Sequence, residues 1–342
     1  MKILSLFDGM ACGALAMQSA GIIIDKYIAY EVDKYAIQTA QHNFPFIEER
    51  GDVFKADFTE YAGFDYLIGG SPCTYWSIAQ TKNRETVASG MGWELFSQYV
   101  RALHEAKPRF FLYENNKSMS AAIRASITET FGFEPILINS ALVSAQNRQR
   151  LYWCGIRQAD GTYKKADIQQ PADRGILLKD ILETNAVTWL EKAYTYTTRC
   201  QGAIIENTLE KHQHTMVAEP VNITKDGKSG TLRATYYKDG VRNLIANSID
   251  KKTCVAMRVN EATKAAPIYE VKDGFITVKG KKYPIKLVDG FYIMRKLTVR
   301  ECMRLQTVPE WYEWPVSKSQ AYKMLGNGWT VEVIAHLLRG LK

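Results

Sequence analysis

Several features that define large protein classes are missing from this sequence. No apolar run approaches the roughly 20 residues that a membrane-spanning helix requires. The N-terminal stretch MKILSLFDGM is too short an apolar run for a signal peptide, and Asp8 interrupts it. Internal repeats and low-complexity tracts are also absent. We therefore expect a cytoplasmic globular protein that has no membrane partner.

Paired cysteines are missing as well. The six cysteines are scattered along the chain, which argues against a disulfide framework and against a zinc site, so we expect reduced thiols. His212 and His214 form a lone HQH with no cysteine or carboxylate cluster close by. This favours a solvated loop over a metal site, and we predict no bound metal.

The charge of the chain is concentrated in one segment. The formal net charge is +8, and residues 221–290 alone hold 14 Lys and Arg against 7 Asp and Glu. Such a basic segment fits two interpretations equally well: a solvated lysine-rich surface, or a face that contacts the phosphates of a polyanion.

Strand-like and helix-like segments alternate through the first half, which predicts an α/β fold with a mostly parallel sheet. Since 342 residues suffice for one large domain and a smaller one, we expect two. The predicted strands cover 2–7, 24–32, a short segment ending at 51–53, 64–70 and 109–115, and a hairpin of 135–142 with 149–156 closes the sheet edge. From about residue 187 the segments are short and β-like, VKGKK (278–282) resembles a hairpin turn, and helical periodicity returns at 298–306 and 330–341. The predicted domains are 1–165 completed by 318–342, then 187–290, with 291–342 as a return segment.

FDGMACG (7–13) follows the first predicted strand, where glycines allow backbone N–H groups to approach a ligand. The spacing of Gly9 and Gly13 does not match G-x-G-x-x-G, so a plain tight turn is an equally good interpretation. Glu31 ends the second predicted strand, where ribose hydroxyls would lie, and Asp52 ends the third, within reach of an adenine amine. This pattern indicates a nucleoside without a pyrophosphate, such as S-adenosylmethionine.

GGSPC (69–73) follows the fourth predicted strand, and Glu114 with Asn115 ends the fifth. The glycines allow close approach and Pro72 stiffens the loop that carries Cys73. A cysteine and a glutamate on neighbouring strand ends suggest a nucleophile with an acid partner. Zinc deaminases combine P-C-x-x-C with H-x-E, but position 76 is Trp and no H-x-E occurs, which excludes that class.

AQNRQRLYW (145–153) places Arg148 and Arg150 in alternation along a predicted strand, on one face with Gln146. Two interpretations stay open for this segment. It is either an exposed charged edge or a pair of guanidinium groups that holds a phosphate and a base carbonyl.

Taken in order, FDGMACG, SPC, EN, QNRQR and LGNGWTVEV (325–333) resemble the motifs of the C5-cytosine DNA methyltransferases. The resemblance covers residues 1–155 and 291–342. The residues within these motifs are most similar to those of the animal de novo enzymes and of phage and bacterial relatives. Two positions depart from the usual pattern: Thr74 where glutamine is more usual, and Asn116 where valine is. The resemblance implies a class I S-adenosylmethionine-dependent methyltransferase sheet, Rossmann-like, with a smaller β-rich target-recognition domain.

The resemblance also implies methyl transfer from S-adenosylmethionine to C5 of a flipped-out cytosine in double-stranded DNA, through a covalent bond between Cys73 and C6. The implied catalytic residues are Cys73, Glu114, Arg148 and Arg150. The implied cofactor-binding residues are Phe7, Asp8, Gly9, Gly13, Glu31, Val32, Asp52, Val53, Pro72, Asn327, Trp329 and Val331. The candidate DNA contacts are Ser77, Gln146, Arg199, Arg233, Lys279, Lys281 and Lys282.

Two other functions remain as alternatives. A catalytically silent DNA-binding regulator would have lost the cysteine or the glutamate, and this chain retains both Cys73 and Glu114. A tRNA cytosine methyltransferase would use the same catalytic residues, although the large basic insertion favours DNA. A companion restriction endonuclease is a candidate partner, and the sequence leaves the target site and the oligomeric state open.

Overall fold

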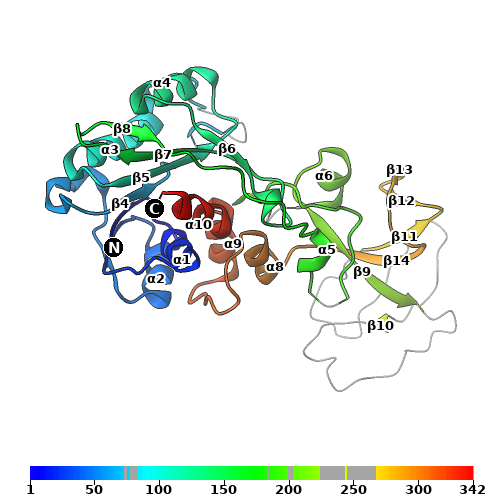
Figure 1. Cartoon of the computed structure of the whole chain (residues 1–342). Helices are drawn as coiled ribbons and strands as arrows, with labels where there is room; N and C mark the ends of the chain where they lie inside the picture. The colour runs from blue at the N-terminus through cyan, green and yellow to red at the C-terminus, as the bar shows by residue number, and fades with distance from the viewer. Residues whose placement is uncertain are drawn as a thin grey trace. The chain divides into compact units, whose positions relative to one another are not determined.

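Strands and helices alternate along the first half of the chain in the computed structural model (Figure 1). The structure describes residues 1–72, 75–77, 84–183, 185–198, 200, 203–223, 243–244 and 267–341. Within these residues, no helix combines the length and the apolar character needed to cross a membrane.

The larger sheet has eight strands in the order β3-β2-β1-β4-β5-β7-β6, with β8 beside β7. Strands β1 to β5 pair in parallel, whereas β7 is antiparallel to each of its neighbours. The parallel strands therefore end at one edge of the sheet, where ligands bind in folds of this kind. The strands are β1 (Lys2–Leu6), β2 (Lys26–Tyr30), β3 (Ile47–Glu49), β4 (Tyr66–Gly69), β5 (Phe110–Asn116), β6 (Ile136–Asn139), β7 (Gln149–Arg157) and β8 (Tyr163–Lys165).

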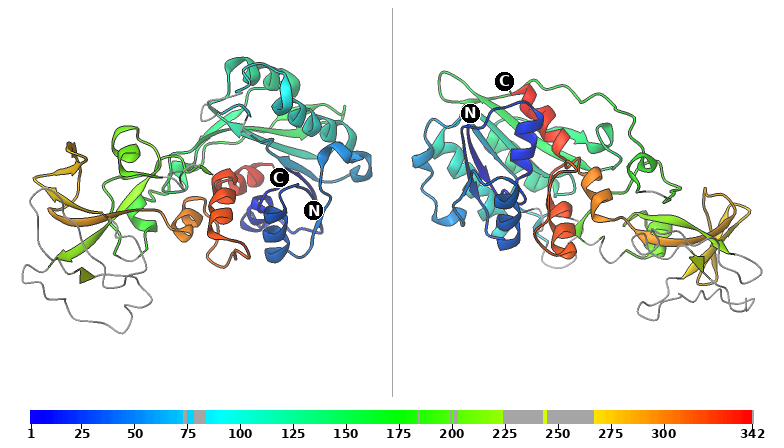
Figure 2. Two further views of the ribbon diagram at one scale, coloured as in Figure 1. Left: turned by 180° about the vertical axis from the view of Figure 1, so that it is seen from behind. Right: turned by 90° about the horizontal axis from the view of Figure 1, so that it is seen from below.

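Helices cover both faces of this sheet, with α3 and α4 on one face and α1, α2 and α10 on the other (Figures 1 and 2). The central strands are accordingly apolar at nearly every position, as in KILSL and YLIG. The helices are α1 (Cys12–Ser19), α2 (Lys34–Asn43), α3 (Gly90–Ala106), α4 (Ala121–Phe131), α8 (Val299–Leu305), α9 (Lys318–Asn327) and α10 (Val331–Gly340), with short 3-10 turns at Val53–Lys55, Phe58–Tyr61 and Ser140–Leu142.

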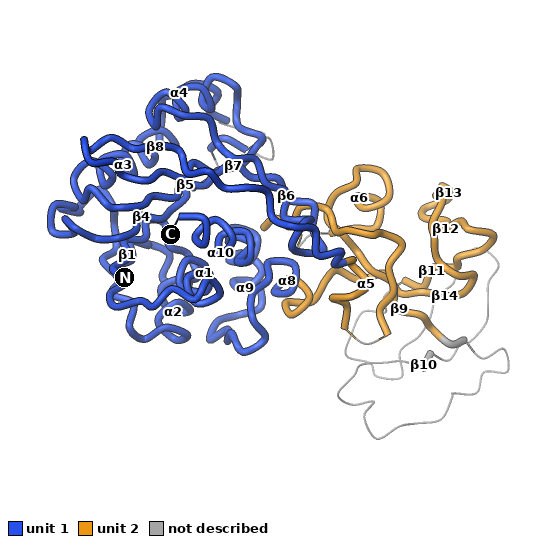
Figure 3. The backbone as a smooth tube through the Cα atoms, viewed as in Figure 1, with its two compact units in different colours: residues 1–176, 303–342 blue, residues 177–302 orange. Residues whose placement is uncertain are grey.

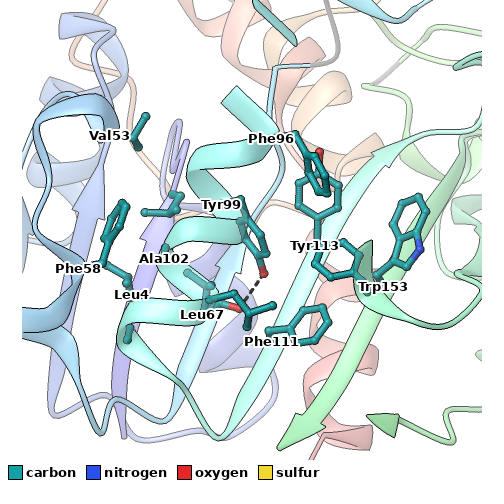
Figure 4. Close-up of a cluster of buried hydrophobic side chains, with 14 of the residues drawn as sticks. Leu4, Val53, Phe58, Leu67, Phe96, Tyr99, Ala102, Phe111, Tyr113 and Trp153 are labelled. Atoms are coloured by element: carbon teal, nitrogen blue, oxygen red, sulfur yellow. Dashed lines mark hydrogen bonds between the residues drawn. The ribbon is translucent and has the colours of Figure 1, made fainter. Parts of the chain in front are cut away.

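A cluster of buried aromatic and aliphatic side chains fixes the sheet against α3 and α4 (Figure 4). Tyr99 of α3 donates its hydroxyl proton to the backbone carbonyls of Leu67 (3.2 Å) and Leu112 (2.9 Å), in neighbouring strands. Tyr113 packs against Tyr99 at 4.9 Å between ring centroids and lies one residue before Glu114. The core thus holds the carboxyl ends of β4 and β5 in fixed register.

The predicted parallel sheet and the predicted hairpin of β6 with β7 are confirmed. The third strand is a correction: β3 ends at Glu49, so Asp52 does not end a strand. Gly51 turns the chain with φ +77°, and Asp52 then accepts a hydrogen bond from Phe54 N (3.0 Å) at the start of a 3-10 turn.

A further expectation about local structure is wrong. Arg148 and Gln146 precede β7, which begins at Gln149, so of the two arginines only Arg150 lies in the strand. Arg148 lies at the end of the loop that joins β6 to β7, where its carbonyl accepts a hydrogen bond from Ser140 N (2.9 Å). The final helix α10 packs against α1.

The chain divides into two compact units (Figure 3), residues 1–176 with 303–342 and residues 177–302. The residue limits given for the domains above stay a prediction. The second unit holds a mainly antiparallel sheet in the order β10-β9-β14-β11-β12-β13, which confirms the expected β-rich module. Its elements are α5 (Leu178–Ile181), α6 (Ile205–Glu210), β9 (Met216–Ile223), β10 (Asn243–Leu244), β11 (Ile268–Lys272), β12 (Phe275–Val278), β13 (Lys281–Pro284) and β14 (Gly290–Lys296).

The expected VKGKK turn is confirmed between β12 and β13. Lys279 and Gly280 both have positive φ, 49° and 81°, and the strands pair antiparallel from Val278 and Lys281 outward. Two successive left-handed residues are the signature of a two-residue hairpin turn that matches the strand twist.

Candidate active site at the strand ends

The turn after β1 is built from residues with left-handed backbone conformation. Phe7, Gly9 and Ala11 have φ of 58°, 61° and 60°, which is costly for the two that are not glycine. Phe7 N bonds to Tyr30 O (2.8 Å), and Gly9 N donates to Glu31 Oε2 (2.9 Å). The ends of β1 and β2 are therefore joined through the Glu31 side chain.

The opposite oxygen of Glu31 is held by its own loop. Glu31 Oε1 accepts hydrogen bonds from Val32 N (2.8 Å) and Asp33 N (2.9 Å). Val32 itself is 72% exposed, which is unusual for valine and leaves an apolar surface beside the turn.

Asp8 is a buried carboxyl group with one oxygen satisfied and the other not. Its Oδ1 accepts from Ser5 Oγ (2.5 Å) and from the Tyr27 hydroxyl (2.6 Å). Its Oδ2 is buried and has no hydrogen-bond partner among the described residues. Burial raises the pKa of Asp8 to about 6, against the lowering effect of those two hydrogen bonds.

Glu49 ends β3 and was not identified from the sequence. Both of its carboxyl oxygens are buried without a hydrogen-bond partner in the described part of the chain. Burial, with the nearby charges of Asp8 and Glu31, raises the pKa of Glu49 to about 8. The sequence signal that could have identified Glu49 is its spacing from Ile47. Residues two positions apart in a strand lie on the same face, and this strand pairs with β2.

Three carboxyl groups thus gather near the ends of β1, β2 and β3. Among the described residues no three such side chains are arranged to hold a metal ion. Buried carboxyl oxygens without hydrogen-bond donors are stabilised by a positively charged group. The cluster therefore favours a positively charged ligand that is not a metal ion.

A second polar cluster lies at the ends of β4 and β5. Glu114 Oε1 pairs with Arg150 Nε at 3.1 Å, and Glu114 Oε2 accepts from Trp329 Nε1 at 3.0 Å. The side chains of Glu114 and Arg150 are only 13% and 14% exposed. Sequence reasoning placed Glu114 and Arg150 together, but it did not foresee the indole of Trp329 at this carboxylate.

The loop that leads from β4 is fastened to β5 by a buried hydrogen-bond network. Ser71 Oγ lies 2.6 Å from the Tyr113 hydroxyl, and Asn115 Nδ2 donates to that hydroxyl (3.1 Å) and to Ser71 O (3.3 Å). Pro72 follows directly, while Cys73 and Thr74 lie outside the described residues. The start of the Cys73 loop is therefore fixed one strand away from Glu114.

Arg148 lies deep in the same unit, and its guanidinium group contacts the C-terminal segment. Its Nη2 donates to the backbone carbonyl of Gly328 at 2.9 Å and also reaches Gly326 O at 3.4 Å. Gln146, predicted to contact DNA, is fully buried, and its Nε2 donates to Leu305 O at 3.2 Å. A contact between Gln146 and DNA would require this side chain to leave its present partners.

The remaining predicted cofactor residues surround the same strand ends. Gly13 is the second residue of α1, and a Cβ there would lie 2.5 Å from the Tyr27 hydroxyl, so a side chain would displace Tyr27. Val53 and Val331 are buried, Asp52 is half-buried, and Asn327 is exposed at the end of α9. Their roles in cofactor binding stay predictions.

The predicted DNA contacts fall mainly in the second unit. Lys279 pairs with Glu206 (2.7 Å) and Lys281 with Glu210 (2.8 Å), so both lysines bind α6. Lys282 is exposed, and Ser77, in the larger unit, is half-buried. Arg199 and Arg233 lie outside the described residues.

Comparisons with known proteins agree with one another. The family model of the C-5 cytosine-specific DNA methylases matches residues 1–342. An orphan methyltransferase of Bacillus phage SPR, M.SPRI, is 24% identical, and the match covers 100% of this chain and 97% of that protein. The type II methyltransferase M1.ScrFI of Lactococcus lactis subsp. cremoris is 27% identical over 97% of this chain and 76% of its own length.

A solved structure of a Spodoptera frugiperda DNMT2 mutant has the same fold. It superposes with a TM-score of 0.58 at 16% identity and covers 99% of both chains. This likeness confirms the expected methyltransferase sheet with a separate smaller sheet.

Proposed function

Because the chain belongs to the C-5 cytosine-specific DNA methylase family, we propose that it methylates a flipped-out cytosine in double-stranded DNA through a covalent intermediate. As a member of this family it is a DNA cytosine-5-methyltransferase. Our proposal concerns the methyl donor, the covalent step and the roles of the residues. The observation that supports them most directly is the Glu114 carboxylate, held by Arg150 and Trp329 beside the loop that leads to Cys73.

Cys73 serves as the nucleophile in this proposal. Cytosine C5 is unreactive as long as the ring is aromatic. Addition of the Cys73 thiolate to C6 forms a sulfur–carbon bond and moves electron density to C5, which can then attack a methyl group. Loss of the C5 proton to a base and cleavage of the bond between sulfur and C6 restore the ring and release Cys73.

Glu114 and Arg150 act on the cytosine ring during this addition. Charge builds up at N3 when the thiolate adds, and Glu114 neutralises it by a proton or a hydrogen bond at that atom. The Arg150 guanidinium, bonded to Glu114 through Nε, can direct its terminal N–H groups toward the O2 carbonyl. Arg148 stabilises the segment next to the site by donating hydrogen bonds to the carbonyls of Gly326 and Gly328.

The carboxyl groups at the ends of β1 to β3 fit S-adenosylmethionine. That molecule carries a sulfonium and an ammonium group, and it would supply the methyl group as an electrophile, with the bond from methyl to sulfur breaking and the sulfur leaving as a neutral thioether. The unpartnered Oδ2 of Asp8 and the oxygens of Glu49 are buried acceptors that suit such a cation. Phe7, Gly9 and Glu31 would hold the nucleoside end, since they form the turn above these strands.

A cytosine stacked in a duplex cannot reach these groups, so the base must leave the helix at a cost of a few kcal/mol. The basic segment 221–290 supplies phosphate contacts that offset this cost. Lys282 is a candidate for such a contact because it is exposed beside the turn of β12 and β13.

The test is to express the wild type and Cys73→Ala in a host that lacks DNA methylation and to map 5-methylcytosine in both DNA and RNA. We expect methylated sites in DNA from wild-type cells and none above background with Cys73→Ala. A matched control is Cys200→Ala, which removes a buried thiol of the second unit and should retain methylation. Unmodified DNA from wild-type cells would contradict the proposal.

The same experiment separates the two alternatives. Methylation of RNA without methylation of DNA would indicate the tRNA-type enzyme. Binding to DNA without any modified base would indicate a silent regulator. A covalent complex that resists denaturation, formed by the wild type with a 5-fluorocytosine oligonucleotide and absent with Cys73→Ala, tests the covalent step separately, because fluorine at C5 blocks the elimination.

A further inference from the structure

Trp329 is the one neutral donor at the Glu114 carboxylate in the described part of the site. We propose that Trp329 is a positioning residue for catalysis, whose indole N–H fixes the orientation of Glu114 toward the target base. This inference rests on the proposed function, and it adds a role for the C-terminal segment beyond contact with the cofactor.

The absence of a side chain at Gly70 leaves room for the hydrogen bond between Trp329 and Glu114. A Cβ at position 70 would lie 2.9 Å from Glu114 Oε2 and 3.4 Å from Trp329 Nε1. It would also lie 2.9 Å from the backbone carbonyl of Glu114. A residue other than glycine would therefore push Glu114 and Trp329 out of their present contact.

Trp329 is itself fixed by polar contacts of its neighbours on both sides. Gly328 O, just before it, accepts from the Arg148 guanidinium at 2.9 Å. Thr330 Oγ1, just after it, donates to Gln306 Oε1 at 2.9 Å and lies 3.0 Å from Ser140 Oγ.

Its own carbonyl is also engaged, by the Cys12 thiol at 3.8 Å. These contacts come from residues that are buried, so water does not compete with them. These contacts fix the backbone on which the indole is mounted, so Trp329 can leave Glu114 only by rotation of its own side chain.

Each oxygen of the Glu114 carboxylate is bound by a different donor. Arg150 Nε binds Oε1 and the indole N–H binds Oε2, so the carboxyl plane is set by two points. Each oxygen retains a second lone pair, which can carry the proton that the carboxyl group donates to N3 of cytosine. Without the indole N–H, the carboxyl group could rotate about Arg150, and productive orientations would become rarer.

The first experiment compares Trp329→Phe with the wild type on a DNA substrate and measures kcat and the Kd for S-adenosylmethionine separately. Phenylalanine keeps an aromatic ring and loses only the N–H donor. We expect kcat to fall about 10- to 100-fold, the usual range for a lost hydrogen bond to a charged group, with the Kd changed less than about threefold. Trp311→Phe, at an exposed tryptophan of the same unit, is the control and should leave both values unchanged.

The second experiment asks whether Trp329 acts through Glu114. The rate loss of Trp329→Phe is measured again in a Glu114→Gln background, by single-turnover methyl transfer. If the indole acts by orienting Glu114, the losses are not additive, and the double variant is within about threefold of Glu114→Gln alone. Thermal melting of each variant shows that it is folded.

Additive losses, or a Trp329→Phe variant with normal kcat and a Kd weakened more than about tenfold, would overturn the inference and leave the proposed function intact. A wild type that fails to methylate DNA would overturn both. Gly70→Ala gives an independent check, since its Cβ disturbs the same contact from the opposite side and should lower kcat with the Kd little changed. A normal kcat in Gly70→Ala would also count against the inference.

Discussion

Glu114 and Glu49 are both glutamates near the carboxyl ends of strands in one sheet, β5 and β3, yet their surroundings are opposite. Glu114 meets a guanidinium on one oxygen and an indole N–H on the other. Glu49 has no donor on either oxygen among the described residues, and burial raises its pKa to about 8. One carboxyl group is supported by fixed donors, while the other is costly to charge in the structure as described.

This difference suggests how two regions at the same edge of the sheet divide the reaction. A group that must take part in proton transfer benefits from donors that already hold it in place, because no reorganisation is then needed during the reaction. A region that must accept a cation benefits from acceptors that are still unsatisfied, because binding then relieves a cost that the free protein carries. Asp8 and Glu49, whose buried oxygens lack a hydrogen-bond partner among the described residues, form a region of the second kind.

The largest expected effect comes from removing the proton-transferring group at the supported site. Glu114→Gln keeps the shape of the side chain but cannot supply a proton at N3, so kcat should fall roughly 10²- to 10⁴-fold. The measurement is methyl transfer to DNA at saturating cofactor. Glu129→Gln, at an exposed position on α4, is the control and should have wild-type activity. A loss below about threefold for Glu114→Gln would mean that the two carboxyl groups do not differ in the way described.

A smaller effect is expected at the unsatisfied site. Asp8→Asn retains an acceptor for Ser5 and Tyr27 but places an amide where the buried Oδ2 lies. Affinity for S-adenosylmethionine should fall about 10- to 100-fold, because a charged acceptor is replaced by a neutral group. Titration calorimetry measures this value directly.

The pH dependence of S-adenosylmethionine binding tests whether the Asp8 carboxylate contributes to the affinity. Asp8 has a pKa raised to about 6, so its carboxylate is present above that pH and is lost as the pH falls through it. Wild-type affinity for the cofactor should therefore weaken between pH 7 and pH 5, while Asp8→Asn should show no such decline. A decline of equal size in both proteins would assign the effect to another group.

The sequence was sufficient for the parts of this site that depend on strand order. Glu31, Gly70 and Glu114 follow predicted parallel strands, and parallel strands end at one edge, so their proximity could be expected from pattern alone. Arg150 could be expected there because the hairpin of β6 with β7 returns it to β5.

The parts that could not be expected depend on side-chain direction and long-range packing. Trp329 reaches Glu114 across 215 positions, and nothing local to either residue encodes that hydrogen bond. Arg148 and Gln146 were expected to alternate along one strand with Arg150, but both precede β7 and both are buried. Glu49 was overlooked because the third strand ends before Gly51, three residues earlier than the position of Asp52 suggested.

The smallest expected effect tests Glu49 alone, through stability. Its pKa is raised from 4.5 to about 8 in the folded protein, so the fold favours the neutral form. The free energy of unfolding should therefore be highest at low pH for this group and should decrease as the pH rises from about 5 to 8. Glu49→Gln cannot titrate, so it should be more stable than the wild type by on the order of 2 kcal/mol at pH 8.5 and nearly equal to it at about pH 4.

Urea unfolding at several pH values, with the cofactor absent, measures this difference. Glu48→Gln is the matched control on the same strand, since Glu48 is exposed and pairs with Arg50 at 2.9 Å; it should follow the wild-type pH dependence. If cofactor is then added at pH 8.5, the wild type should gain more stability than Glu49→Gln, because the bound cation offsets a charge that only the wild type carries. An equal gain in both proteins would show that Glu49 is buried for packing alone, and the contrast with Glu114 would then be one of stability and not of function.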